Sequence, residues 1–212
     1  MFAKGSELIL LASAAVTALT LLFVPLTMYM LIPFAFFLVV TSFLMYFFRD
    51  PPRTSPKEEG TIVSPVEGKI VIVDKLPDGK TKIQVELSVF DVHVTRAPAD
   101  CTVLNIDKKW GGHWPVWYKH KYDKHNARQH FDLKTDDGLI FRITQIAGIF
   151  AWRCVSYVPV GARLKENSKM GIIRFGSAAN ILLPENCEYD PVVKVGERVR
   201  AGETIIAKRK KS

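Results

Sequence analysis

Residues 8–48 contain no charged side chain, and this feature constrains the fold of the chain more than any other. Because roughly 20 apolar residues cross the hydrocarbon core of a bilayer, the stretch predicts two helices, Leu8 to Val24 and Leu26 to Phe48, separated near Pro25. A re-entrant pair and a buried hairpin inside a soluble core are the alternatives. A cleaved signal peptide fits poorly because its apolar core is only roughly 7 to 15 residues long. We therefore expect residues 1–48 to anchor the chain in the cell membrane.

The net charge of +8 lies beyond this apolar stretch. Lys4 and Glu7 cancel, and Arg49, Arg53 and Lys57 follow directly after the last apolar residue. Because positive residues next to a membrane segment stay on the cytoplasmic side, the remainder of the chain is predicted to face the cytoplasm. A basic surface beside a bilayer attracts anionic lipids, each Lys or Arg contributing roughly 1 kcal/mol. No basic helix or nucleic-acid-binding module accompanies the charge, so we expect no nucleic-acid partner.

The residues after the anchor have the pattern of a β protein. Residues 49–60 are rich in proline and charge and predict a linker. Over residues 61–212, short alternating runs separated by Pro-Asp-Gly and Gly signals predict strands and hairpins. Residues 193–206 repeat small turns between short strands, like the hammerhead-like hairpins of biotinyl and lipoyl carrier domains, but Lys169 lacks the sequence context of a modified lysine. We predict a mainly β fold, a β-rich α+β domain preceded by a hydrophobic helical hairpin.

Cysteine and histidine spacing argues against disulfides and metals. The three cysteines form no CxxC pair and cannot all pair within one chain, which favours a reducing compartment. They are Cys101, Cys154 and Cys187. Four histidines in the second half of the chain match no compact ligand motif, so we expect no metal. They are His113, His120, His125 and His130.

The dipeptide Gly176-Ser177 indicates a possible self-cleavage site, because the peptide bond between its two residues can be broken by the serine itself. A serine hydroxyl can attack the carbonyl of the preceding residue, and glycine at that position has no side chain to hinder the attack. Elimination from the resulting ester leaves dehydroalanine, which hydrolyses to a pyruvoyl group able to capture an amine. A turn between strands is the alternative interpretation of Gly-Ser. The surrounding sequence decides between the two.

Six segments occur in a fixed order along the chain. They are Arg49-Asp50-Pro51-Pro52-Arg53, Ser64-Pro65-Val66-Glu67-Gly68-Lys69-Ile70, Asp91-Val92-His93-Val94-Thr95-Arg96-Ala97-Pro98, Gln145-Ile146-Ala147-Gly148, Arg174-Phe175-Gly176-Ser177 and Ile181-Leu182-Leu183-Pro184. In this order they resemble the motifs of the short, bacterial-type phosphatidylserine decarboxylases, whose processing site contains RFGS. Several ordered motifs with compatible spacing are more specific than any single one.

The resemblance implies an enzyme that decarboxylates phosphatidylserine to phosphatidylethanolamine in phospholipid biosynthesis. It implies cleavage between Gly176 and Ser177 into a large chain, residues 1–176, and a small chain, residues 177–212. The cofactor would be a pyruvoyl group derived from Ser177. The resemblance also places His93 at the functional histidine of the family, which we expect to deliver a proton to the substrate carbon. A structural histidine bonded to backbone is the alternative.

Self-cleavage requires a base near Ser177. Some longer relatives resemble a Ser-His-Asp arrangement with a second histidine three positions after the first, and that position is Arg96 in this chain. The predicted triad is therefore Ser177, His93 and Glu67, with strain and backbone polarisation as the alternative. The residues predicted to contact the lipid headgroup are Arg96, Gln145 and Arg153.

Two positions depart from the family pattern. Glu67 stands where an aspartate is usual, and Ala178-Ala179-Asn180 replace a common Arg-Val-Asp. These changes keep a second hypothesis open, a non-catalytic, membrane-anchored lipid-binding homologue. A serine hydrolase is a third hypothesis, although the chain lacks the Gly-x-Ser-x-Gly elbow around Ser177.

Residues 108–120 concentrate tryptophans among cations. Tryptophan favours the headgroup layer of a bilayer, and cations there bind lipid phosphate, so the segment predicts a contact with the membrane surface. Aromatic packing beneath a long loop is the alternative.

Overall fold

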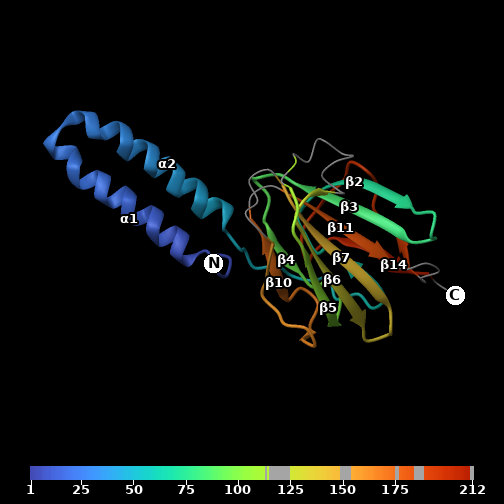
Figure 1. Cartoon of the computed structure of the whole chain (residues 1–212). Coiled ribbons are helices and arrows are strands. Elements are labelled where there is room, and N and C mark those ends of the chain that lie inside the picture. The colour runs from blue at the N-terminus through green and yellow to red at the C-terminus, as the bar shows by residue number, and fades with distance from the viewer. Residues whose placement is uncertain (113, 115–124, 149–153, 175–176, 184–188, 211–212) are drawn as a thin grey trace. The chain divides into compact units, whose positions relative to one another are not determined.

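The computed structural model describes residues 1–112, 114, 125–148, 154–174, 177–183 and 189–210. The chain divides into two compact units, Met1–Pro52 and Arg53–Ser212, of which the first is helical and the second consists of β-sheets (Figure 1). The predicted fold class, a mainly β domain after an apolar helical hairpin, is confirmed.

The first unit is a hairpin of two apolar helices. Its elements are α1 (Glu7–Phe23), the short 3₁₀ helices η1 (Val24–Leu26) and η2 (Met28–Met30), and α2 (Leu31–Phe47). Thr17 of α1 links the helices, because its hydroxyl lies 2.9 Å from that of Thr41 and donates to the Phe37 carbonyl oxygen at 3.2 Å. With their 3₁₀ extensions, the helices Glu7–Leu26 and Met28–Phe47 each have 20 residues, enough to span a bilayer core.

The described residues of the second unit form three antiparallel sheets. The strands are β1 (Thr61–Val63), β2 (Gly68–Lys75), β3 (Thr81–Leu87), β4 (Val94–Arg96), β5 (Cys101–Lys109), β6 (Arg128–Thr135), β7 (Ile140–Ala147), β8 (Cys154–Ser156), β9 (Arg163–Leu164), β10 (Lys169–Ile173), β11 (Ser177–Leu183), β12 (Tyr189–Pro191), β13 (Arg198–Val199) and β14 (Ile205–Arg209). The large sheet has the order β13-β2-β3-β11-β7-β6-β5-β9. The small sheets have the orders β4-β10-β8 and β1-β14-β12.

Strand β11 lies inside the large sheet, between β3 and β7 (Figure 1). Its pairing with both neighbours has no register shift, so residues directly opposite each other point to the same face of the sheet. Ile181 therefore faces the core beside its partners Ile83 and Ile143. Each of these three side chains is completely buried. The large sheet is therefore held together in its middle by residues that follow position 176.

The β4-β10-β8 sheet covers one end of the core face of the large sheet. Gly171 of β10 lies close to the large sheet, because a Cβ atom there would be 3.3 Å from Gln145 Nε2. Within its own sheet, the same Cβ atom would lie 2.4 Å from the Val155 carbonyl oxygen of β8. Ile173 of the same strand packs against Ala147 of β7. The two sheets thus enclose a layer of side chains beside the start of β11.

Candidate functional site

The Gly176–Ser177 bond belongs to a crossover between two sheets. Strand β10 ends at Ile173 in the small sheet, and β11 begins at Ser177 in the large sheet. The backbone of Ser177 pairs with Leu87 on one side and with Ala147 on the other. Gly176 and the Ser177 side chain lie outside the described residues. Cleavage at this bond would interrupt a connection and leave the pairing of both strands intact.

His93 lies next to the end of the strand that leads into this crossover. The Ile173 amide donates to the His93 carbonyl oxygen at 3.2 Å, which extends the antiparallel β4–β10 pairing by one residue. The ring of His93 is buried, and its Nδ1 lies 2.8 Å from the Asp91 carbonyl oxygen. Because a carbonyl oxygen only accepts, Nδ1 carries the hydrogen in this contact. In the neutral ring, Nε2 is then the basic nitrogen.

Three predicted site residues meet at this end of the sheets. Side-chain alternation places His93 on the same face of its strand as Thr95, whose hydroxyl accepts from Gln145 Nε2 at 2.7 Å. Gln145 pairs with Ala179, two residues after Ser177. His93, Gln145 and the backbone of Ser177 therefore lie around the same intersheet layer. Arg153 lies outside the described residues.

Glu67 and Arg96 belong to a different network, centred on Arg53. The Arg53 guanidinium forms ion pairs with Glu67 and, at 3.2 Å, with Glu203. Asn167 extends the network, since it donates to the Arg53 carbonyl oxygen at 2.7 Å and accepts from the Arg96 guanidinium at 3.1 Å. This contact draws Arg96 away from the face that Thr95 presents to Gln145. The role of Glu67 as the third member of a triad stays a prediction.

The residue that orients His93 is itself fixed. The carboxylate of Asp91 accepts from the Ser88 amide at 2.8 Å and forms an ion pair with Arg198. Arg198 lies beyond the Gly176–Ser177 bond, whereas Asp91 and His93 precede it. A residue of the segment after the predicted cleavage site therefore positions the histidine on the segment before it.

Asn126 connects the aromatic segment to this end of the sheet. Its buried side chain accepts from the Trp114 amide and donates to the Trp114 carbonyl oxygen, both at 2.8 Å. It also donates to the carbonyl oxygen of Ala147, the backbone partner of Ser177, at 2.7 Å. The base of the segment is thus attached directly beside Ser177.

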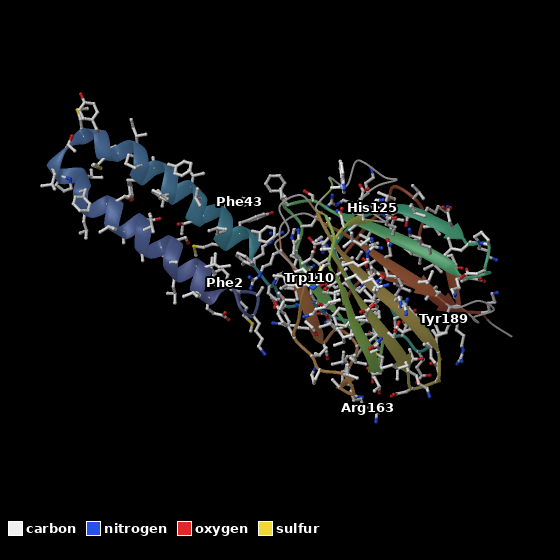
Figure 2. All side chains as sticks on the ribbon, viewed as in Figure 1. Phe2, Phe43, Trp110, His125, Arg163 and Tyr189 are labelled. Atoms are coloured by element: carbon white, nitrogen blue, oxygen red, sulfur yellow. The ribbon has the colours of Figure 1, made fainter. Side chains whose placement is uncertain are left out.

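Exposed aromatic and basic side chains surround the Ser177 end of the sheet and form what we call the basic aromatic rim. Trp110, labelled in Figure 2, follows β5. It is 93% exposed, and Phe90, which follows β3, is 62% exposed. Both strands end where β11 begins. The rim consists of Phe90, Lys108, Lys109 and Trp110.

A cleft among the described residues lies at the opposite end of the sheet. This acidic cleft has a volume of about 770 Å³ and is lined by Ser55, Lys57, Glu58, Glu59, Gly60, Thr61, Ala99, Asp100, Thr135, Asp136, Asp137, Lys165, Glu166, Tyr189 and Arg209. Figure 2 shows Tyr189, which lines the cleft, well away from His125. Arg163, also labelled there, forms an ion pair with Asp136 of the cleft. Hydrogen bonds from Lys165 and from the Glu166 amide lower the pKa of Asp100. Burial and the charge of Asp100 raise the pKa of Glu166.

Two of the cysteines are poor nucleophiles. Cys101 and Cys154 are free and buried, and burial raises the pKa of each thiol to about 12. Since the thiolate is the reactive form, neither competes with Ser177 as a nucleophile near neutral pH. Cys187 lies outside the described residues. Within the described ranges, no three His, Cys, Asp or Glu side chains gather as a metal site.

Several site residues were missed by the sequence analysis. Thr95 lies inside a recognised motif, and its position two residues after His93 was an available signal. Arg198 acts across the crossover and Asn126 stands in an irregular segment, so no local pattern marks either one. Gln129, which pairs with Gln145, resembles any polar residue of an alternating strand.

The fold places the buried His93 and the backbone of Ser177 close to the point where the chain crosses between two β-sheets. The family model of phosphatidylserine decarboxylase matches residues 40–207. A phosphatidylserine decarboxylase proenzyme of Oleidesulfovibrio alaskensis is 40% identical over 82% of this chain and 81% of its own length. A Methanococcoides burtonii protein with the name "Putative archaetidylserine decarboxylase proenzyme" is 39% identical over 82% of this chain and 78% of its own length. A phosphatidylserine decarboxylase proenzyme of Streptomyces coelicolor is 37% identical, with coverage of 77% and 72%.

The chain belongs to the phosphatidylserine decarboxylase family. The family predicted from the ordered motifs is thereby confirmed. Its members among these relatives are named as proenzymes, which is the name of a chain that requires processing.

Proposed function

We propose that this chain matures by cleaving itself at Gly176–Ser177 and then decarboxylates phosphatidylserine to phosphatidylethanolamine with a pyruvoyl cofactor. The observation that carries the proposal is the placement of His93, with its basic Nε2, beside the crossover that contains this bond. Membership of the decarboxylase family and the proenzyme names of the relatives support it.

The maturation step needs one base and one hydroxyl. His93 Nε2 accepts the proton of the Ser177 hydroxyl, whose oxygen attacks the Gly176 carbonyl carbon, so the peptide bond becomes an ester. Elimination then releases the Gly176 carboxylate, and hydrolysis of the remaining dehydroalanine releases ammonia. Glu67 as the third member of the triad is part of this proposal, and its ion pair with Arg53 gives it a second, structural role.

The residues around Ser177 fit a pyruvoyl group. From Ala178 onward, β11 is fixed on both sides by β3 and β7, so the new chain end keeps its place after cleavage. A pyruvoyl group supplies a ketone that captures an amine and withdraws the electron pair left when carbon dioxide departs. His93 then holds the proton that the substrate carbon requires. Arg96, Gln145 and Arg153 remain our predicted headgroup contacts.

The two chains, residues 1–176 and 177–212, are expected to remain associated after cleavage. Strand β11 of the small chain pairs with β3 and β7 of the large chain, and β14 pairs with β1. Ion pairs cross the same boundary between Arg53 and Glu203 and between Glu58 and Lys208. The backbone pairing of a central strand is difficult to replace by water, so separation requires unfolding.

We place the enzyme at the cytoplasmic face of the cell membrane, in contact with anionic lipids. The apolar helices α1 and α2 supply the anchor, and Arg49 and Arg53 follow them as cytoplasmic residues do. The basic aromatic rim suits the headgroup layer, since Trp110 favours that interface and Lys108 and Lys109 attract lipid phosphate. The rim lies at the same end of the sheet as Ser177, where a lipid substrate must arrive.

The proposal is tested with the full chain in detergent micelles containing phosphatidylserine. The native chain should release carbon dioxide and form phosphatidylethanolamine, whereas Ser177→Ala should stay uncut at 23.9 kDa and show no turnover. Ser156→Ala is the matched control, because Ser156 lies in the neighbouring small sheet and should mature normally. Turnover by Ser177→Ala would refute the mechanism. A native chain that binds lipid but stays uncut and inactive would support the non-catalytic alternative instead.

A further inference from the structure

Two glutamines lie side by side in the intersheet layer. Gln129 of β6 and Gln145 of β7 are direct cross-strand partners on the same face of the sheet, and both are completely buried. Gln145 Nε2 donates to Thr95, but Gln145 Oε1 and both amide atoms of Gln129 have no hydrogen-bond partner within the described residues. A buried polar group without a partner weakens folding, so this pair is not explained by stability.

The pair lies close to the predicted reaction centre. Gln145 is directly opposite Ala179 and therefore diagonal to Ser177, at about 7–8 Å between Cα atoms in an antiparallel sheet. Gln129 is one strand further from β11. From the facing sheet, His93 and Thr95 border the same layer. A headgroup joined to the reaction centre at Ser177 has these amides within reach.

We propose that Gln129 and Gln145 bind the carboxylate of the serine headgroup, an inference that rests on the proposed function. Amide N–H groups donate to a carboxylate, and Gln129 has two such hydrogens without a described acceptor. A neutral amide orients the carboxylate without a full opposite charge. A guanidinium at this position would stabilise the ionised carboxylate before reaction and slow its loss as carbon dioxide. The geometry thus favours glutamine over arginine here.

The same contact separates substrate from product. The ethanolamine headgroup has an amine and a phosphate but no carboxylate, so it gains nothing from the amide pair. Binding through the carboxylate therefore favours the serine lipid and promotes release of the product.

The chain supplies a matched control for Gln129. Gln84 of β3 is also a buried glutamine, 1% exposed, and both of its amide atoms lack a partner within the described residues. Gln84 pairs with Asn180, whereas Gln145 pairs with the preceding residue, Ala179. Because successive residues of a strand point to opposite faces, the Gln84 side chain lies on the face opposite to that of Gln145. The changes Gln84→Leu and Gln129→Leu remove the same chemical group from the two faces.

The test uses the mature full chain and three measurements. Gln129→Leu should raise the KM for phosphatidylserine about tenfold, the loss of roughly one hydrogen bond to a charged group. In cyanoborohydride trapping on the small chain, it should lose the preference for serine lipid over ethanolamine lipid. Its cleavage at Gly176–Ser177 should match that of the native chain, which shows that the variant folds. Gln84→Leu should keep the native KM and the native trapping preference.

Two outcomes would overturn the inference. One is an unchanged KM and trapping preference in Gln129→Leu, and the other is an equal change in Gln84→Leu. If Gln129→Leu does not fold, Gln129→Met takes its place, because methionine keeps the length of the side chain without an N–H donor. The same two outcomes then apply to Gln129→Met. A native chain that neither cleaves nor traps any amine would instead refute the proposed function itself.

Discussion

The two ends of the large sheet differ in charge and shape, and the difference shows where chemistry is built. At one end, the acidic cleft has a volume of about 770 Å³ and carboxylates that are paired with neighbouring cations, such as Asp100 with Lys165. At the other end, His93 and Gln145 are buried near the start of β11, and the basic aromatic rim lies at the same end. The cleft is lined by neither His93 nor Ser177, so we expect the chemistry at the other end.

The largest expected difference between the two ends is that between variants of His93 and of Glu166. His93→Ala removes the base near Ser177 and should lower both cleavage and kcat by about 10²- to 10⁴-fold, the usual contribution of a general acid–base residue. Glu166→Gln changes a partly buried carboxyl of the acidic cleft and should leave both rates native. Rates from fragment formation and carbon dioxide release check the pair. Equal losses in both variants would show that the cleft takes part in the chemistry.

The rim provides the next largest effect. Trp110→Ala removes an exposed side chain at the Ser177 end, whereas Ile140→Ala removes one that is 51% exposed at the hairpin between β6 and β7, at the opposite end. We expect Trp110→Ala to raise the KM for phosphatidylserine about fivefold in vesicles containing anionic lipid, since about 1 kcal/mol of interfacial binding is lost. Ile140→Ala should not change it. The prediction fails if the two variants have the same KM.

Arg198 and Arg163 offer a comparison of two exposed arginines. Each forms an ion pair with an aspartate, Arg198 with Asp91 at the Ser177 end and Arg163 with Asp136 beside the cleft. Arg198→Ala releases the residue that orients His93 and should lower kcat about fivefold, equivalent to about 1 kcal/mol. Arg163→Ala should leave kcat unchanged. Steady-state kinetics of both variants decides whether the ion pair positions His93.

The smallest predicted effect concerns pH and the cleft. Because the pKa of Asp100 is lower in the folded state than in the unfolded chain, its ionised form adds stability above about pH 4, which is lost as the pH falls through the folded pKa. Asp100→Asn should therefore lower the free energy of unfolding at pH 7 by less than about 1 kcal/mol, since the pair is partly exposed. Urea unfolding of the uncut Ser177→Ala background at pH 7 and pH 3 measures this. The difference should shrink as the pH falls, and a difference that is as large at pH 3 as at pH 7 contradicts the assignment.

The sequence predicted the parts of the fold that depend on local pattern. A stretch without charge from Leu8 to Phe48 leaves a helical hairpin as the simplest solution, and alternation with turn residues marks strands such as Lys82 to Leu87. The start of the second unit could not be predicted from local pattern in the same way. Arg53, in the segment expected to be a linker, forms ion pairs with Glu67 and Glu203, which no pattern around residue 53 reveals.

Only those candidate site residues that lie inside recognisable sequence motifs could be predicted. Ser177, His93 and Gln145 came from motifs, and the structure brings their backbones or side chains to one end of two sheets. Gln129 could not be found this way, because its importance comes from the register between β6 and β7 and from the small sheet that buries it. Such pairings join residues far apart in the chain, so no window of sequence contains them.

Intact mass of the purified chain, before and after denaturation, tests the central claim most directly. We predict two polypeptides, residues 1–176 and residues 177–212, that elute together under native conditions and separate only in denaturant. The small chain should lack a free amino terminus and carry a carbonyl that reacts with an amine reagent. A single species of 23.9 kDa that decarboxylates phosphatidylserine at the full rate would contradict the account.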